Sequence, residues 1–303
     1  MKLSYLIRSI SQRISKIITA LQRNEKINTL LIAFSYLYPI ILIAISWKDI
    51  GDLDFSNFVN PFLLSLFYGF VSLILQAINW NIIVGNNYSK LIENIEIYFK
   101  TLLMRRLPGG FWHWHGRVSL YKNSVAQTSN KIGKANTVEF LGLVLSGATT
   151  FLLVEHFYWG GVLFIFSYFV LFYLGREKYK KNVSKLFVPL VLVLSYMVCW
   201  IMGGYILHTL LSYISPTINI TLFKSLSYWV ITGTIGTVFF FMPITGIFRE
   251  LTLSALLSNY LDFSKIILIS LLIRVILYLC DVSVSLIGLG IIALINKKSP
   301  RTG

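Results

Sequence analysis

Residues 186–211 read LFVPLVLVLSYMVCWIMGGYILHTLL, a run that contains no Asp, Glu, Lys or Arg. A helix needs about 20 mostly apolar residues to cross the ~30 Å hydrocarbon core of a bilayer. This run is therefore long enough to span a membrane, and other stretches of the chain share its character. The predicted spans are residues 29–47, 59–84, 137–158, 159–175, 186–211, 225–242 and 264–295.

The composition of the whole chain agrees with these spans. Of its 303 residues, 56% are hydrophobic and only 13% are charged, and the mean hydropathy is +0.72. A protein surrounded by water does not have this balance. No Gly/Ser/Pro-rich linker divides the chain. We expect an all-α polytopic membrane protein with seven to eight transmembrane helices, two of its segments being broken by Pro and Gly and expected to be re-entrant.

The basic residues predict the orientation of the chain. Six Lys or Arg residues precede the first span, eight lie in 85–136 and five in 176–185, whereas the loop 48–58 has one Lys and three Asp. Basic loops stay on the cytoplasmic side. The N-terminus is therefore predicted to be cytoplasmic and the protein to lie in the cell (plasma or inner) membrane. The net charge of +15 is a membrane signature, and no nucleic-acid partner is expected.

The termini are predicted to flank one membrane domain. Residues 1–28 combine apolar side chains at helical spacing with six basic residues, which indicates an amphipathic helix on the cytoplasmic surface. A signal peptide is the alternative, but no continuous apolar core or small-residue cleavage site is present. Residues 29–296 are predicted to form a single transmembrane domain, and 297–303 a short basic cytoplasmic tail.

The predicted number of membrane crossings conflicts with the charge of the C-terminal tail, and this conflict draws attention to residues 243–262. Seven crossings from a cytoplasmic N-terminus leave the basic tail outside, against the positive-inside rule. The stretch 243–262 is an eighth candidate, but Pro243, Gly246, Arg249 and Glu250 interrupt it. It is either a re-entrant half-helix or a broken crossing.

The first candidate site is the segment 105–117, RRLPGGFWHWHGR. It places Pro108, Gly109 and Gly110 between Arg105 and Arg117. Backbone N–H groups freed at such a break, beside a guanidinium, suit a phosphate group. The alternative is that these arginines only anchor a loop beside anionic lipids. The two histidines of the segment, at i and i+2, are weak evidence for a metal, and we expect neither a metal nor a cofactor.

The second candidate site is the segment 241–250, FMPITGIFRE, which again joins a Pro/Gly break to an arginine. In the spans that follow the two breaks, Glu139 lies 31 residues after Pro108 and Arg274 lies 31 residues after Pro243. This spacing indicates two halves built on one plan.

Ionisable residues within the predicted hydrocarbon are the remaining candidates. Glu139, Arg274 and Asp281 lie in or beside spans, where a charge is costly unless it pairs or lines a wet cavity. We expect Arg274 to pair with Glu139 or Glu250, and Asp281 to pair with Arg117 or Arg249. The alternative is that the pairs only lock helices together. Cys199 and Cys280 lack any metal-binding spacing and are interpreted as packing residues.

At these two segments the chain resembles the transmembrane domain of lysylphosphatidylglycerol synthases and their stand-alone, flippase-like relatives. The resemblance rests on Pro108-Gly109, on Gly116-Arg117, and on the segment from Pro243 to Glu250, which reads Pro-x-x-Gly-x-x-Arg-Glu. It spans most of the chain, which contains no synthase-like soluble domain. Ile244, Thr245 and Phe248 depart from the family pattern.

The resemblance implies translocation or handling of an anionic phospholipid or a polyprenyl-phosphate-linked lipid in cell-envelope biogenesis. Envelope-biosynthesis enzymes are further expected partners. No Walker A pattern is present, so any driving force is passive or ion-coupled. One alternative is a membrane glycosyltransferase that uses Asp52 and Asp54, and another is a non-transporting scaffold.

Overall fold

The chain folds into helices throughout the part that the structure describes. The structure is a computed structural model, and it describes residues 41, 44, 55–85, 91–106, 112–124, 129–179, 186–239 and 245–298. Its elements are α4 (Phe55–Gly85), α5 (Leu91–Leu102), the 3₁₀ turn η2 (Leu103–Arg106), α6 (Trp112–Ser124), α7 (Ser129–Glu155), α8 (Phe157–Tyr179), α9 (Val188–Ile214), α10 (Leu222–Val238), α11 (Thr245–Leu257) and α12 (Phe263–Lys298). The predicted all-α class is confirmed for these residues.

Five of the described helices are long and apolar enough to cross a membrane: α4, α7, α8, α9 and α12. They coincide with five of the predicted spans, and they indicate a membrane-embedded protein. The predicted span 225–242 coincides with α10, whose 17 residues leave it outside this group. The predicted helix 1–28 lies outside the described residues, as does the span 29–47 apart from Ile41 and Ala44, which are helical.

A tight turn separates α7 from α8, which the sequence predicts as two adjacent spans. Helix α7 ends at Glu155 and α8 begins at Phe157, so His156 alone lies between them. Gly160 makes this turn possible, because a Cβ at that position would lie 2.5 Å from the backbone nitrogen of Leu153. The two helices therefore run antiparallel and in contact.

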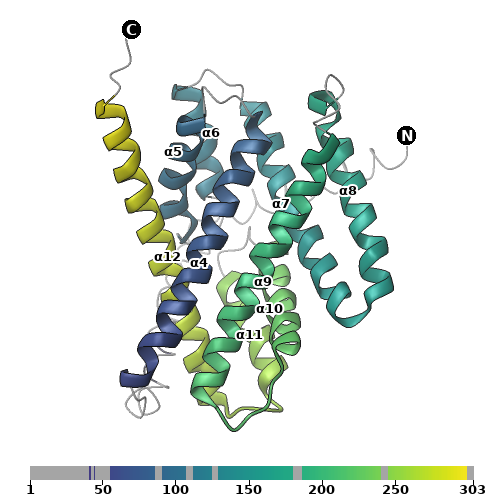
Figure 1. The fold of residues 1–303 in the computed structure, drawn as a ribbon, viewed down its shortest axis with the longest axis vertical. Coiled ribbons are helices and arrows are strands. Elements are labelled where there is room, and N and C mark those ends of the chain that lie inside the picture. Colours follow the sequence, from purple (N-terminus) through teal and green to yellow (C-terminus); the bar gives the residue numbers. More distant parts are fainter. Residues whose placement is uncertain are drawn as a thin grey trace, which may run out of the picture.

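The remaining four helices are shorter and form two antiparallel pairs. In Figure 1, α5 and α6 occupy the upper part of the molecule, whereas α10 and α11 occupy the lower part. The lengths of these helices are 12, 13, 17 and 13 residues, against 23 to 36 residues for the five long helices.

Along the chain, the sequence breaks fall between the two helices of each pair. Pro108, Gly109 and Gly110 separate η2 from α6, and Pro243 separates α10 from α11. These four residues lie outside the described part of the chain. Gly246 is described as the second residue of α11. Because Pro lacks an amide proton and Gly favours non-helical backbone, helix ends at these positions are expected from the sequence.

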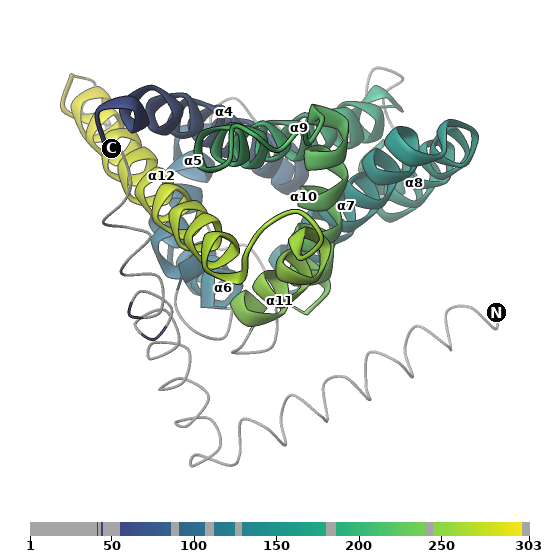
Figure 2. The ribbon, with the colours of Figure 1, turned by 90° about the horizontal axis from the view of Figure 1, so that it is seen from below.

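Helix α9 is the centre of the bundle. It packs against α4, α7, α8, α10 and α12. Viewed from below, α4 and α9 lie along one side and α6 and α11 along the other (Figure 2). Among the described helices, α8 packs against α7 and α9, and its outer face exposes Val162, Ile165, Phe166 and Phe169. Such a face suits contact with lipid tails, because hydrocarbon imposes no cost on exposed apolar side chains.

Candidate functional site

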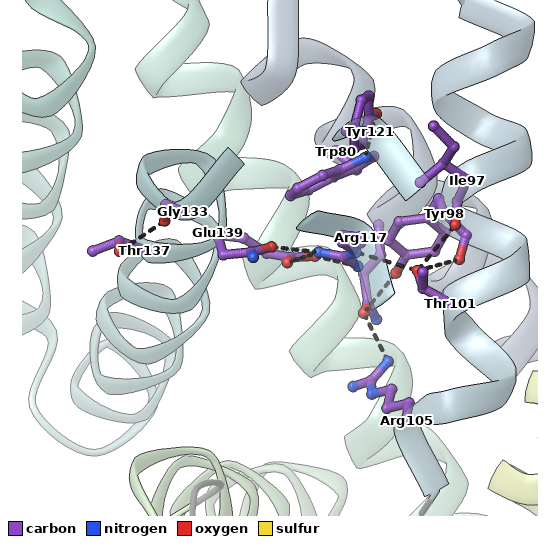
Figure 3. A network of polar contacts seen from close by, with 12 residues as sticks. Trp80, Ile97, Tyr98, Thr101, Arg105, Arg117, Tyr121, Gly133, Thr137 and Glu139 are labelled. Atoms are coloured by element: carbon purple, nitrogen blue, oxygen red, sulfur yellow. Dashed lines mark hydrogen bonds and ion pairs between the residues drawn. The ribbon is translucent and has the colours of Figure 1, made fainter. Parts of the chain in front are cut away.

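An ion pair links α6 to α7 inside the bundle. The guanidinium of Arg117 forms it with the carboxylate of Glu139, and these two residues are only 3% and 4% exposed. The same guanidinium donates from Nη1 to Asn136 Oδ1 at 3.3 Å and from Nε to Thr101 Oγ1 at 3.4 Å. Every nitrogen of the Arg117 fork therefore has an acceptor, which a buried charge requires. Figure 3 shows Arg117 between Glu139 on one side and Tyr98 and Thr101 on the other.

Aromatic rings enclose the same guanidinium. Its Cζ lies 4.0 Å from the ring centroid of Trp80 and 4.8 Å from that of Tyr98. Both distances are within the range of a cation–π interaction. The indole of Trp80 in turn donates to Tyr121 at 3.0 Å, and the hydroxyl of Tyr121 donates to Asn94 at 2.9 Å. These contacts fasten the α5–α6 pair to α4.

Gly116 permits the close helix contact that positions the next residue, Arg117. A Cβ at Gly116 would lie 2.6 Å from Met104 Sδ and 3.3 Å from Thr101 Cγ2. Helix α6 therefore approaches α5 and η2 closely at this point. The close approach brings Arg117, the next residue, within reach of Thr101.

A second ion pair, of opposite arrangement, links α11 to α12. Here the carboxylate, Glu250, lies on the short helix, and the guanidinium, Arg274, lies on the long one. The side chain of Glu250 is 8% exposed and that of Arg274 is 31% exposed. Each short pair is therefore tied by an Arg–Glu contact to the long helix that follows it.

Arg249, the neighbour of Glu250, faces an aromatic ring. Its Cζ lies 4.2 Å from the ring centroid of Trp229 on α10. The indole of Trp229 occupies the place of a missing side chain at Gly203 on α9, where a Cβ would lie 1.9 Å from the indole nitrogen. Reciprocally, Trp200 on α9 covers Gly233 on α10, where a Cβ would lie 2.3 Å from the indole ring. Each of the two helices therefore packs a tryptophan ring against a glycine of the other.

A cavity of about 140 Å³ lies between the two short pairs. This volume is well above the roughly 15 Å³ that one water requires. Its wall takes residues from α4, η2, α7, α9, α10, α11 and α12. The polar and aromatic lining consists of Ser72, Gln76, Arg105, Cys199, Trp200, Trp229, Thr237, Arg249, Cys280 and Asp281.

Gln76 positions the arginine of the first motif in this cavity. Arg105 donates from Nη1 to Gln76 Oε1 at 3.2 Å, and the amide of Gln76 donates to Ser72 at 3.2 Å. The hydroxyl of Tyr98 also donates to Gln76 Oε1, at 3.4 Å. Asp281 interacts electrostatically with Arg105. Two guanidinium groups and one carboxylate therefore share one internal space.

The structure divides the predicted site residues into three sets. Arg105, Arg249 and Asp281 line the cavity. The ion pairs hold Arg117, Glu139, Glu250 and Arg274. The third set is Pro108, Gly109, Gly110 and Pro243, which lie outside the described residues, together with Gly246, which lies in α11.

Of the expected pairings, one of the two alternatives for Arg274 is confirmed. Arg274 pairs with Glu250, and the alternative partner, Glu139, pairs with Arg117 instead. For Asp281 the expected partners were Arg117 and Arg249. Arg117 pairs with Glu139, whereas Arg249 lies with Asp281 on the cavity wall, and Asp281 also interacts electrostatically with Arg105.

Sequence reasoning missed several cavity residues. Gln76 is the one that the sequence could have revealed, because an amide side chain within the predicted span 59–84 indicates an internal polar site. Trp200 and Trp229 carry no such signal, since tryptophan is common in membrane helices. Cys199 and Cys280 are free thiols and lie on the cavity wall as well as packing against neighbouring helices.

This arrangement can hold an anion, because the two guanidinium groups on the cavity wall are of the kind that donates N–H groups to the oxygens of a phosphate. Among the described residues no group of three or more His, Cys, Asp or Glu side chains is placed to hold a metal ion. Asp52 and Asp54 lie outside these residues. Comparison of the chain with protein-family models, curated proteins and solved structures gives no match.

Proposed function

We propose that this protein translocates or handles a lipid with an anionic phosphate headgroup, either an anionic phospholipid or a polyprenyl-phosphate-linked lipid, in cell-envelope biogenesis. The observation that carries the proposal is the cavity that gathers Arg105, Arg249 and Asp281 from three separate elements. The headgroup occupies this polar space while the tails stay in the surrounding hydrocarbon.

The helix lengths support a re-entrant arrangement around the cavity. At 1.5 Å per residue, a 13-residue helix is only about 20 Å long and falls short of the ~30 Å hydrocarbon core. Helices α5 and α6 therefore enter and leave the membrane on one side, and α10 and α11 do so on the other. Their broken ends meet near the middle of the bilayer, where transporter sites commonly lie.

The charges at the two ends support a cytoplasmic assignment for one of them. The end of α6, the start of α7 and the end of α12 lie at the upper end of Figure 1, and these helix ends carry the exposed Lys122, Lys131, Lys134 and Lys297. The end of α7 and the starts of α10 and α12 lie lower, and charges of both signs are found there: Glu155, Lys224, Lys265 and, directly before α12, Asp262. By the positive-inside rule the upper end faces the cytoplasm of a cell membrane. With the α10–α11 pair re-entrant, the C-terminal end of α12 is also cytoplasmic.

The motifs support membership of the flippase-like group that resembles the transmembrane domain of lysylphosphatidylglycerol synthases. Three residues that carry the resemblance have defined places in the structure. Arg249 lines the cavity, Arg117 forms an ion pair with Glu139, and Glu250 forms one with Arg274. Cargo is held by the cavity arginines, and relative rocking of the two halves exposes it to alternate leaflets. Envelope-biosynthesis enzymes remain proposed partners.

Reconstitution tests this function. The purified full chain is placed in vesicles containing phosphatidylglycerol with a fluorescent tail, and a membrane-impermeant quencher is added outside. We expect quenching beyond the outer-leaflet fraction, and we expect Arg249→Gln to abolish the excess. Lys131→Gln, which removes an exposed charge, serves as the control.

The assay is repeated with imposed proton and sodium gradients, because coupling to an ion is compatible with the absence of a Walker A motif. If neither phosphatidylglycerol nor a polyprenyl phosphate moves under any of these conditions, transport is rejected. The scaffold alternative would then be favoured.

A further inference from the structure

The balance of buried charge in the described part of the chain points to a particular class of headgroup. The pairs Arg117–Glu139 and Arg274–Glu250 are each neutral. The cavity wall holds two further guanidinium groups, Arg105 and Arg249, and one carboxylate, Asp281. The described residues of the cavity wall therefore carry one net positive charge.

An uncompensated charge inside a membrane bundle is costly, because the low-dielectric surroundings do not stabilise it as water does. A guest with one negative charge makes the occupied cavity neutral. A guest with two negative charges leaves an excess negative charge beside Asp281. The same wall therefore discriminates between anions by their charge.

Phosphate esters differ in this respect. A phosphodiester, as in phosphatidylglycerol, carries one negative charge. A phosphomonoester, as in phosphatidic acid or a polyprenyl phosphate, has a second pKa of about 6 and approaches two charges above neutral pH. The two classes present similar oxygens to an arginine, so geometry alone separates them poorly.

Resting on the proposed function, we propose that this cavity selects singly charged phosphodiester headgroups over phosphomonoesters, with Asp281 as the specificity-determining residue. The carboxylate does not bind the guest's phosphate. It offsets one arginine and repels a second negative charge. Arg105 and Arg249 supply the attraction for both classes.

Two short-chain lipids that differ by one methyl group isolate charge from size. Dioctanoyl phosphatidylmethanol is a phosphodiester and dioctanoyl phosphatidic acid is a monoester. Their dissociation constants for the purified full chain are measured at pH 8 in detergent by calorimetry. We expect the methyl ester to bind tighter by on the order of tenfold, since one unit of misplaced charge exceeds the 1.4 kcal/mol that this factor represents.

The variant Asp281→Asn should reverse the preference, because the cavity wall then carries two positive charges. Asp262→Asn, which removes an exposed carboxylate outside the cavity, should leave the ratio of the two constants unchanged. If Asp281→Asn does not fold, the comparison on the unmodified chain still decides the matter.

The outcomes separate this inference from the proposed function. Equal binding of the two lipids by the unmodified chain, or an unchanged ratio in a folded Asp281→Asn variant, overturns charge selection and leaves lipid binding intact. Failure to bind either lipid overturns the proposed function itself.

Discussion

Arg274 of α12 forms an ion pair with Glu250 of α11, the residue that follows the cavity-lining Arg249 in the chain. This contact fastens the second short pair of helices to the long helix that carries Asp281. Between α6 and α7, Arg117 and Glu139 form the corresponding ion pair, with the arginine on the short helix and the carboxylate on the long one. Each short pair of helices is thus joined to a long helix by an Arg–Glu pair, and the two ion pairs have opposite directions.

The Arg117–Glu139 pair is expected to be essential for stability. Glu139→Gln leaves a buried guanidinium without its counter-charge, which costs about 3–5 kcal/mol. We therefore expect a large fall in the detergent melting temperature. Glu96→Gln is the matched control, because it breaks the more exposed Glu96–Lys100 pair on α5, which is worth about 0–1 kcal/mol. Equal effects of the two substitutions would contradict the structure.

The Glu250–Arg274 pair is expected to support transport by holding α11 in place against α12. Glu250→Arg and Arg274→Glu should each reduce lipid movement, because like charges then face each other between α11 and α12. The double exchange restores opposite charges and should recover much of the activity. A double variant no more active than the single variants, although inserted normally, would show that the pair does not act as a unit.

The glycines under the two tryptophans are expected to tolerate no side chain. Gly203→Ala should displace Trp229 and, with it, the partner of Arg249, because the new Cβ overlaps the indole. We expect lower stability and weaker lipid binding, measured on the purified protein. Gly161→Ala on α8 is the control, since no atom lies within 4 Å of its Cβ position. Its effect should be close to neutral.

The cation–π contact on Arg249 predicts a graded response. Arg249→Lys keeps the charge but loses the planar fork that stacks on Trp229 and binds two oxygens. Lipid affinity should therefore fall between that of the native chain and that of Arg249→Gln. Binding by Arg249→Lys equal to native would show that only charge is needed at this position.

Cysteine labelling tests the re-entrant topology. Starting from a chain with Cys199→Ser and Cys280→Ser, one cysteine is introduced at Thr217, Asn259 or Lys297 and exposed to an impermeant maleimide on intact cells. If α10 and α11 form one re-entrant pair, Thr217→Cys and Asn259→Cys react from the same, outer side. Lys297→Cys should react only after permeabilisation. Labelling of Thr217→Cys and Asn259→Cys from opposite sides would mean that this region crosses the membrane.

The apolar helices and their ends follow from the sequence alone. Residues 186–211 contain no charged side chain, and the structure places 188–211 of them within α9. The same local logic located the breaks near Pro108 and Pro243, on either side of which described helices end and begin. Preference for hydrocarbon and the backbone limits of Pro and Gly are properties of each residue, so neighbours distant in the chain are not needed to infer them.

Only the tertiary structure decided which charges meet. Glu139 was compatible with Arg274 by composition and depth, yet it pairs with Arg117, because the rotation of α7 and the close approach of α6 at Gly116 set its surroundings. The exchange of Trp200 and Trp229 across two glycines likewise depends on the packing of α9 against α10. Partner choice inside a membrane depends on the rotation and depth of every helix at once, and these are set by packing between segments that are far apart in the chain.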